Sequence, residues 1–333
     1  MDHFYFLTIS HRNLLELMIK FALSTNKNFI NLKEGGNMFN KKFLKHYYIM
    51  LIPAAIWLVL FNIVPMFGIV MAFEDFNPGL GMWKSPFIGF ANFEYMFQMS
   101  DIKQILTNTI VIAMGKIIAN LIVPLVFAIL LNELCIQKLY RPIQTIVYLP
   151  YFLSWVILAK IVLNIFGYVG PINSVINFFG GESINFFGIA SMFRPLVIGT
   201  DIWKNFGYNA IIYLSTMLGI APELYEAAAV DGAGRFRRIW HITLPGIKMT
   251  VALLAILSLG NVLNAGFDQI FNLYNPLVYS TGDILDTWVY RAGLINLQFS
   301  LATAVGLLKS VVSFVLITLG YWMADKFAGY KLF

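Results

Sequence analysis

Residues 226–245, EAAAVDGAGRFRRIWHITLP, form the most polar and most basic long stretch between two hydrophobic runs of the sequence. Just upstream, Pro222 suits the first turn of a helix, where its missing N–H costs nothing. The three alanines 227–229 favour helix and leave one side thin enough for another surface to approach closely. Gly232 and Gly234 predict a turn, because a positive φ is cheap at glycine. The stretch therefore predicts a helix, a glycine turn and a second helix.

The charges of this stretch fit the same arrangement. Glu223 and Glu226 lie near the positive N-terminal end of the first helix, where acidic side chains are favoured. The second helix is predicted to be basic, with Pro245 ending it, and its arginines are Arg235, Arg237 and Arg238.

The composition indicates a membrane protein. Hydrophobic residues make up 59% of the chain and charged residues only 12%, whereas a soluble domain carries about 25% charged residues. The net charge of +6 is then explained by basic loops that orient the chain in a membrane, and not by a nucleic-acid-binding surface. Lipid is therefore an expected partner. The single cysteine, Cys135, excludes an internal disulfide.

Six hydrophobic runs are each long enough to cross about 30 Å of hydrocarbon as a helix. We therefore predict an all-α, polytopic membrane protein with six transmembrane helices at about 47–72, 106–131, 143–166, 195–218, 249–271 and 301–324.

Six spans place both termini on one side of the membrane, and the positive-inside rule selects that side. The flank before the first run, the second loop, residues 226–248 and the tail carry most of the Lys and Arg residues near the spans. The three opposite connections together hold Lys84, Lys103, Arg194 and Arg291. Both termini and the 226–245 loop are therefore predicted to be cytoplasmic.

Residues 1–37 differ from the rest and are interpreted as a leader that is disordered or results from a mis-assigned start. Codons for Glu34, Gly35 and Gly36 can spell a bacterial ribosome-binding sequence just ahead of Met38. Met38 is then the true start, and residues 38–333 form the transmembrane domain. The alternative is a genuine amphipathic N-terminal helix.

Residues 220–246 resemble the EAA loop of binding-protein-dependent ABC importer permeases. The family pattern is EAA, then DGA, then an aromatic-rich helix that ends in I-x-LP. The matching positions are Glu226, Ala227, Ala228, Asp231, Gly232, Ala233, Ile242, Leu244 and Pro245. Residues 51–77, residues 268–294 and the terminal GYKLF are similar to the LplB-like branch, which serves oligosaccharides or polysaccharide fragments.

The resemblance implies a type I importer fold in a bacterial plasma membrane. It also implies a heterodimer with a second permease, two ATPase subunits, an extracellular solute-binding lipoprotein and an oligosaccharide substrate. The loop residues above other than Ile242, together with Arg235 and Arg238, would couple this chain to the ATPase.

Chemistry on the chain itself is not indicated. No G-x-x-x-x-G-K-[ST] phosphate loop and no His/Cys/Glu cluster with metal-ligand spacing occurs in the sequence. The chain is therefore expected not to be an enzyme, to hold no cofactor or metal, and to depend on MgATP bound by a partner ATPase.

Polar residues inside the spans are costly, so they tend to face protein or water. Asn261, Asn264 and Asp268 are expected to share one face of the fifth span and, beside Phe267, to line a sugar path or to hold two permeases together. Tyr148, Tyr151 and Trp155 either line that path or pack. Asp201 and Lys204 are expected to neutralise each other. Further polar candidates in the spans are Lys116, Asn120, Lys160, Asn164, Asn205, Asn209 and Lys309.

Two other functions stay open. An ABC permease for a non-sugar solute such as a peptide or polyamine would share the loop. An ion-coupled secondary transporter would need no ATPase, although the internal repeats common in such folds are not apparent. The sequence does not identify the sugar, its linkage or its length.

Overall fold

The computed structural model describes residues 41–134 and 136–328, and these residues are mostly helical. The only β feature among them is an isolated bridge between Glu74 and Phe87. The predicted all-α class is confirmed. The predicted leader, residues 1–37, lies outside the described residues.

The chain divides into two units, Met1–Val70 and Met71–Phe333. In the first, α2 (Lys41–Leu58) continues through a π turn (Val59–Ile63) into α3 (Val64–Met66). From residue 48 onward they belong to the apolar helical run Tyr48–Phe73, in which only 6% of an 18-residue apolar window is buried. The run suits a helix that faces lipid or a partner protein.

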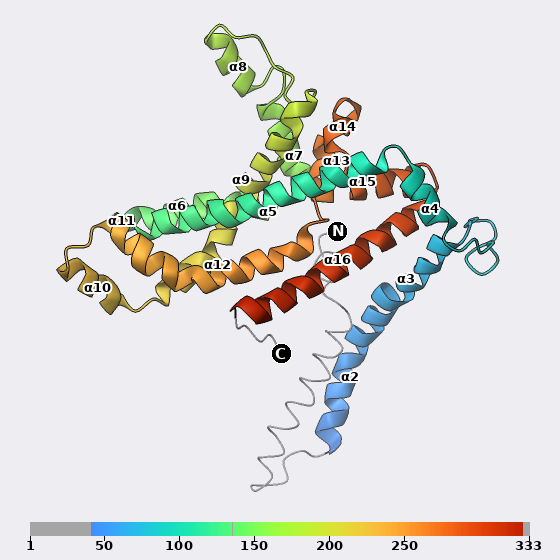
Figure 1. Ribbon diagram of the computed structural model, residues 1–333, viewed down its shortest axis with the longest axis horizontal. Coiled ribbons are helices and arrows are strands. Elements are labelled where there is room, and N and C mark those ends of the chain that lie inside the picture. Colours follow the sequence, from blue (N-terminus) through green and yellow to red (C-terminus); the bar gives the residue numbers. More distant parts are fainter. Residues whose placement is uncertain (1–40, 135, 329–333) are drawn as a thin grey trace. The chain divides into compact units, whose positions relative to one another are not determined.

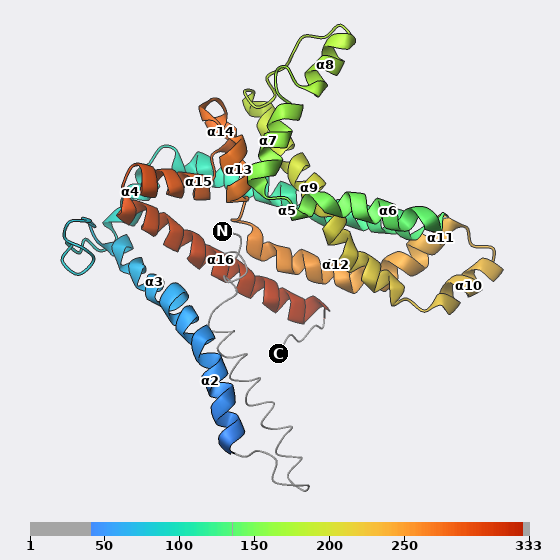
Figure 2. The same ribbon diagram turned by 180° about the vertical axis from the view of Figure 1, so that it is seen from behind.

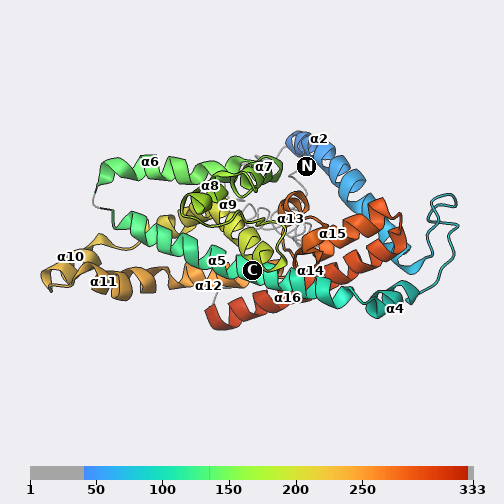
Figure 3. The same cartoon turned by 90° about the horizontal axis from the view of Figure 1, so that it is seen from above.

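The second unit contains the remaining helices. They are α4 (Ala91–Gln98), α5 (Ile102–Asn132), α6 (Gln137–Tyr148), α7 (Trp155–Ile165), α8 (Pro171–Phe178), α9 (Ala190–Leu218), α10 (Pro222–Val230), α11 (Arg235–Arg238), α12 (Leu244–Ser258), α13 (Phe267–Leu273), α14 (Tyr279–Gly282), α15 (Leu285–Tyr290) and α16 (Phe299–Ala328). Figures 1 and 2 show α10 and α11 together at one end of this unit, while α4 and α15 lie toward the other end. Figure 3 shows the same separation from above.

Four helices of the described residues are long and apolar enough to span a membrane: Tyr48–Phe73, Ile102–Asn132, Arg235–Asn261 and Phe299–Met323. The bent pair Lys138–Phe152 and Trp155–Ile165 supplies a fifth if it counts as one span. The predicted run 195–218 lies in α9, which has 29 residues and is about 44 Å long at 1.5 Å per residue. Its polar residues lower its hydropathy, so the sixth span stays a prediction.

The run 143–166 is not one straight helix. α6 and α7 meet at an angle of 106°, separated by a 3-10 turn (Leu149–Phe152) that contains Pro150. Ser154 then caps α7 by accepting a hydrogen bond from the backbone N–H of Ile157 at 3.4 Å. The proline and the new cap explain why the backbone turns here.

The run 249–271 is also interrupted. α12 ends at Ser258, the 3-10 turn Leu259–Asn261 follows, and α13 begins at Phe267. Between them, Gly266 has a φ of +89°, a conformation that glycine adopts readily. The membrane-length helix of this region is Arg235–Asn261, so it starts well before residue 249.

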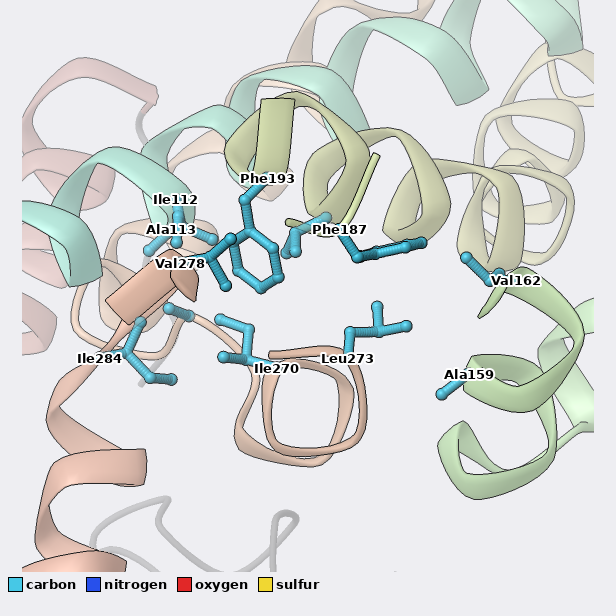
Figure 4. Packing of buried hydrophobic residues seen from close by; sticks show 12 residues of the cluster. Ile112, Ala113, Ala159, Val162, Phe187, Phe193, Ile270, Leu273, Val278 and Ile284 are labelled. Atoms are coloured by element: carbon cyan, nitrogen blue, oxygen red, sulfur yellow. The ribbon is translucent and has the colours of Figure 1, made fainter. Parts of the chain in front are cut away.

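A core cluster forms where α5, α7, α9 and α13 meet. Phe193 of α9 lies at its centre, with Ile112 of α5 and Val278 nearby (Figure 4). Ile270 and Leu273 of α13 approach from the other side. The short helix after the break at Gly266 is therefore fixed by apolar burial.

The connection 272–299 is folded into short helices. Arg291 forms an ion pair with Asp283 and places its guanidinium 4.7 Å from the ring centre of Tyr279. The Nδ2 group of Asn108 donates to the Asp283 carbonyl at 3.0 Å, which ties the connection to α5. Burial, and then the neighbouring phenol of Tyr279, raises the pKa of Tyr274 to about 12.

We predict that Gly207→Ala destabilises the packing of α6 on α9. A Cβ at Gly207 would lie 2.5 Å from Val147 Cγ1 and 2.6 Å from the Val147 carbonyl oxygen, so the helices must separate at a cost of about 1–3 kcal/mol. The apparent melting temperature of the purified protein should fall.

The matched control is Gly199→Ala in the same helix, where a Cβ meets no atom within 4 Å. Alanine favours helix over glycine by roughly 1 kcal/mol, so this variant should melt no lower than the parent. Equal melting temperatures for the two variants would contradict the close approach.

Candidate functional site: a helical hairpin and a polar cavity

The predicted hairpin is present, and its turn has a defined geometry. α10 begins with Pro222 in its first turn and ends at Val230. Gly232 follows with a φ of +74°. The N–H of Gly232 donates to the Ala229 carbonyl at 3.1 Å, and the N–H of Ala233 donates to the Ala228 carbonyl at 2.8 Å. These two bonds make a Schellman motif, which ends a helix sharply.

Only one of the two glycines uses a positive φ. Gly234 has a φ of −65° and an extended ψ, and it precedes α11 as its N-cap residue. The turn therefore depends on Gly232 alone.

The prediction that Pro245 ends the second helix is wrong. α11, a π turn (Ile239–Thr243) and α12 form one continuous helical run, Arg235–Asn261. Pro245 lies in the first turn of α12, directly after the π turn. The wider π turn accommodates the ring and the missing N–H, so the helix continues.

Two contacts hold the limbs of the hairpin together. The hydroxyls of Tyr225 and Thr243 are 3.0 Å apart and hydrogen-bond across the limbs, and Thr243 is buried. At the base, a Cβ on Gly246 would lie 2.6 Å from Ile220 Cδ1. The limbs are therefore linked to each other and closely packed where they join the rest of the unit.

The hairpin presents most of the predicted residues to solvent. Those exposed are Glu226, Ala227, Asp231, Gly232, Arg235 and Pro245, and those half-buried are Ala228, Ala233, Arg238 and Leu244. A hollow of about 250 Å³ lies between the limbs, lined by Ala228, Asp231, Ala233, Arg237, Arg238, His241 and Ile242.

The apolar part of this surface was not predicted from the sequence. Val230 and Phe236 are each 89% exposed and Trp240 is 69% exposed. The sequence signal for this surface was the presence of large apolar side chains within a basic segment. Exposed apolar side chains of this kind typically mark an interaction surface.

A polar cavity of about 430 Å³ lies elsewhere in the second unit, between α5, α9 and the end of α12. Its lining residues are Ala113, Lys116, Ile117, Asn120, Leu121, Asp201, Asn205, Asn209, Ile212, Tyr213, Leu254, Ser258, Asn261, Asn264 and Gly266. Two of the predicted path residues, Asn261 and Asn264, are among them.

The expected common face of Asn261, Asn264 and Asp268 does not exist. The helix breaks between Asn261 and Phe267, so helical spacing does not apply across this interval. Asp268 is exposed, and its carbonyl accepts a hydrogen bond from Asn272. The Phe267 ring stacks on Phe271 at 5.1 Å.

Lys116 is the buried charge of the cavity, with only 7% of its surface exposed. Its ammonium donates to the Ala265 carbonyl at 2.6 Å and to Gln269 Oε1. It also lies 3.5 Å from Asp201 Oδ1. Gln269 is fixed in turn, because its Nε2 donates to the Val197 carbonyl at 2.7 Å. The ammonium thus joins α5 and α9 to the segment at the helix break.

Asp201 was expected to pair with Lys204, but its ion-pair partner in the structure is Lys116. Asp201 also accepts from Asn120 Nδ2 at 2.8 Å, and Asn120 accepts from Asn209 at 3.2 Å. Lys204 donates to the Leu153 carbonyl.

The three predicted aromatic residues do not line the cavity. Tyr151 stacks on Tyr208 with ring centres 3.8 Å apart and an interplanar angle of 5°. Trp155 lies beneath the Lys204 ammonium at 5.1 Å, and Tyr148 is half-buried in α6.

Known proteins resemble this chain over most of its length. Residues 125–328 match the family described as binding-protein-dependent transport system inner membrane component. Protein LplB of Bacillus subtilis (strain 168) is 42% identical over 290 residues, covering 87% of this chain and 91% of LplB. The polygalacturonan/rhamnogalacturonan transport system permease protein YteP of the same organism is 43% identical over 286 residues, covering 85% and 88%.

A solved structure resembles it as well. It is a bacterial ABC transporter involved in the import of the acidic polysaccharide alginate, with a TM-score of 0.79 and 35% identity. The match covers 86% of this chain and 97% of that one.

We predict that Lys116→Met strongly destabilises the protein. Removing one partner of a buried ion pair typically costs about 3–5 kcal/mol, and here the Ala265 carbonyl, Gln269 and Asp201 all lose a donor. Thermal unfolding of the purified protein measures the loss.

Adding Asp201→Asn to Lys116→Met should recover part of that loss, because the carboxylate that has lost its counter-ion is then removed. The matched control is Lys160→Met on α7, where the side chain is exposed and should change the melting temperature little. If the melting temperature of Lys116→Met lies within about 1–2 °C of the parent's, the shift expected for a surface substitution of about 0.5 kcal/mol, the assigned network is contradicted.

Proposed function

Because the chain belongs to the family of binding-protein-dependent transport system inner membrane components, we propose that it is the permease subunit of an ATP-driven importer of oligosaccharides or polysaccharide fragments. The observation that carries this substrate class is the 43% identity to YteP over most of both chains. The likeness to the alginate importer supports the same class. The family resemblance and the permease fold predicted from the sequence are thereby confirmed.

The chain is a multi-pass membrane protein of a family of transport permeases, and in this proposal it carries no enzymatic activity of its own. In this proposal two copies of a separate ATPase bind MgATP and hydrolyse it, since the sequence contains no phosphate loop. A second, different permease completes the membrane part, and an extracellular lipoprotein delivers the solute.

The hairpin is the proposed contact with the ATPase. Its exposed Val230, Phe236 and Trp240 offer apolar anchors, and Arg235 and Arg238 lie beside them for charged contacts. Exposed apolar side chains next to charged ones are typical of an interface. Because Tyr225 and Thr243 link the limbs, the hairpin is suited to move as one body.

The helix that forms the second limb of the hairpin would carry a movement of the hairpin to the cavity. The run Arg235–Asn261 begins in the hairpin and ends at Asn261 in the cavity wall, with Leu254 and Ser258 on the way. Closure of the ATPase dimer on ATP would therefore displace one wall of the proposed solute path. We propose that the hairpin and both termini lie on the cytoplasmic side of the membrane, because the connections on that side carry an excess of Lys and Arg.

The substrate assignment is tested with the assembled importer. The tagged chain is purified from native membranes in mild detergent, co-purifying proteins are identified by mass spectrometry, and the complex is screened with a glycan panel for stimulated ATP hydrolysis. We expect a second permease, an ATPase and stimulation by an oligosaccharide together with the binding protein. Recovery of the folded chain alone, or stimulation only by peptides or polyamines, would overturn the proposal.

We predict that Gly232→Ala weakens coupling while Gly234→Ala does not. Neither new Cβ meets an atom within 4 Å, so the two variants differ in backbone alone. A residue with a Cβ pays about 1–2 kcal/mol in the left-handed conformation that Gly232 adopts. Solute uptake per ATP hydrolysed should fall about fivefold or more in Gly232→Ala only, and equal coupling in both would contradict the role of the turn.

A further inference from the structure

The charges in the cavity cancel each other. Among the described residues that line it, Lys116 is the only basic one and Asp201 the only carboxylic acid, and they lie 3.5 Å apart. The ammonium has three N–H groups, which face Ala265, Gln269 and Asp201. Two of these N–H groups are hydrogen-bonded within the chain and the charge has Asp201 as its counter-ion, so this cation is already paired.

The uncommitted polar groups of the cavity are amides. The side chains of Asn205, Asn261 and Asn264 make no hydrogen bond within the described part of the chain, although all three line the cavity. Asn120 differs, because both of its amide N–H groups are used, toward the Lys116 carbonyl and Asp201. The three free amides come from α9 and from the two sides of the turn that follows α12.

These amides are better hydrogen-bond partners for the hydroxyl groups of a solute than for its carboxylate groups. A free amide offers two donors and one acceptor, and a sugar hydroxyl both donates and accepts. A carboxylate only accepts, and it must give up its hydration without meeting a free cation, which is costly. It would also face the carboxylate of Asp201, which lines the same cavity.

We propose that the cavity of this chain selects neutral, hydroxyl-rich sugars over uronic acids, with Asn205, Asn261 and Asn264 as the groups that bind the hydroxyls. The inference rests on the proposed function and narrows its substrate class. The proposed substrate differs from those in the names of two relatives, polygalacturonan/rhamnogalacturonan and acidic alginate.

The test compares sugars that differ only in their carboxyl groups. The complex of both permeases and the ATPase, in lipid nanodiscs without the binding protein, is titrated with α-(1→4)-linked trigalacturonate and with its carboxyl-reduced counterpart. Trimannuronate and its carboxyl-reduced form make a second pair. Saturation-transfer NMR gives the affinities. At least one neutral sugar should bind at least tenfold more tightly than its acidic partner.

Variants assign this preference to the amides. Asn205→Leu and Asn261→Leu should each weaken binding of the neutral sugar about fivefold to tenfold, as expected for one or two lost hydrogen bonds. Asn261→Lys adds a free cation and should raise the ratio of acidic to neutral affinity at least tenfold. The matched controls are Asn132→Leu and Asn132→Lys, at the exposed end of α5, which should change neither value.

The outcomes separate this inference from the proposed function. Equal or tighter binding of the acidic sugars, no binding of any of the four, or neutral binding that the amide variants leave unchanged would overturn the inference. The proposed function survives each of these results if an oligosaccharide still stimulates ATP hydrolysis through the binding protein. It fails if no sugar does so.

Discussion

The contacts of the Lys116 ammonium are the constraint on which the cavity depends. A charge at 7% exposure is tolerated in a protein interior only if it is paired and hydrogen-bonded. Its partners come from α9 and from both sides of the Gly266 break, because Asp201, the Ala265 carbonyl and Gln269 all face it. The break frees backbone carbonyls that need donors, and the ammonium supplies one. The interrupted helix and the buried cation therefore stabilise each other.

The helical run Arg235–Asn261 relates the hairpin to the cavity. Its first residues form the basic limb, and its last residues line the cavity wall. The π turn at Ile239–Thr243 lets this run pass Pro245 without ending. A continuous helix transmits displacement better than a loop does, and the hairpin is fixed to it through the hydrogen bond between Tyr225 and Thr243.

The cavity and the hairpin use charge in opposite ways. The hairpin exposes Arg235 beside large apolar side chains, an arrangement suited to a protein partner that supplies complementary charge. In the cavity, Lys116 and Asp201 form an ion pair, and the side-chain amides of Asn205, Asn261 and Asn264 also line it. A low-charge cavity also suits a transport path, because a solute held by strong charge pairs would leave slowly.

The sequence by itself determined the membrane class, the glycine turn and the family, because these follow from local composition and from one long motif. It predicted a positive φ at both Gly232 and Gly234, and only Gly232 has one; it also selected Asn261 and Asn264, which line the polar cavity. Only the tertiary structure decided the partner of Asp201, since Lys116 lies 85 residues earlier in the chain and helical spacing favoured Lys204. It also decided that Asp268 leaves the face of Asn261, because a break at Gly266 cancels the helical period. The local sequence pattern predicts a helix correctly as long as the helix is unbroken. The points at which a helix bends or ends depend on contacts with residues that are distant in the sequence.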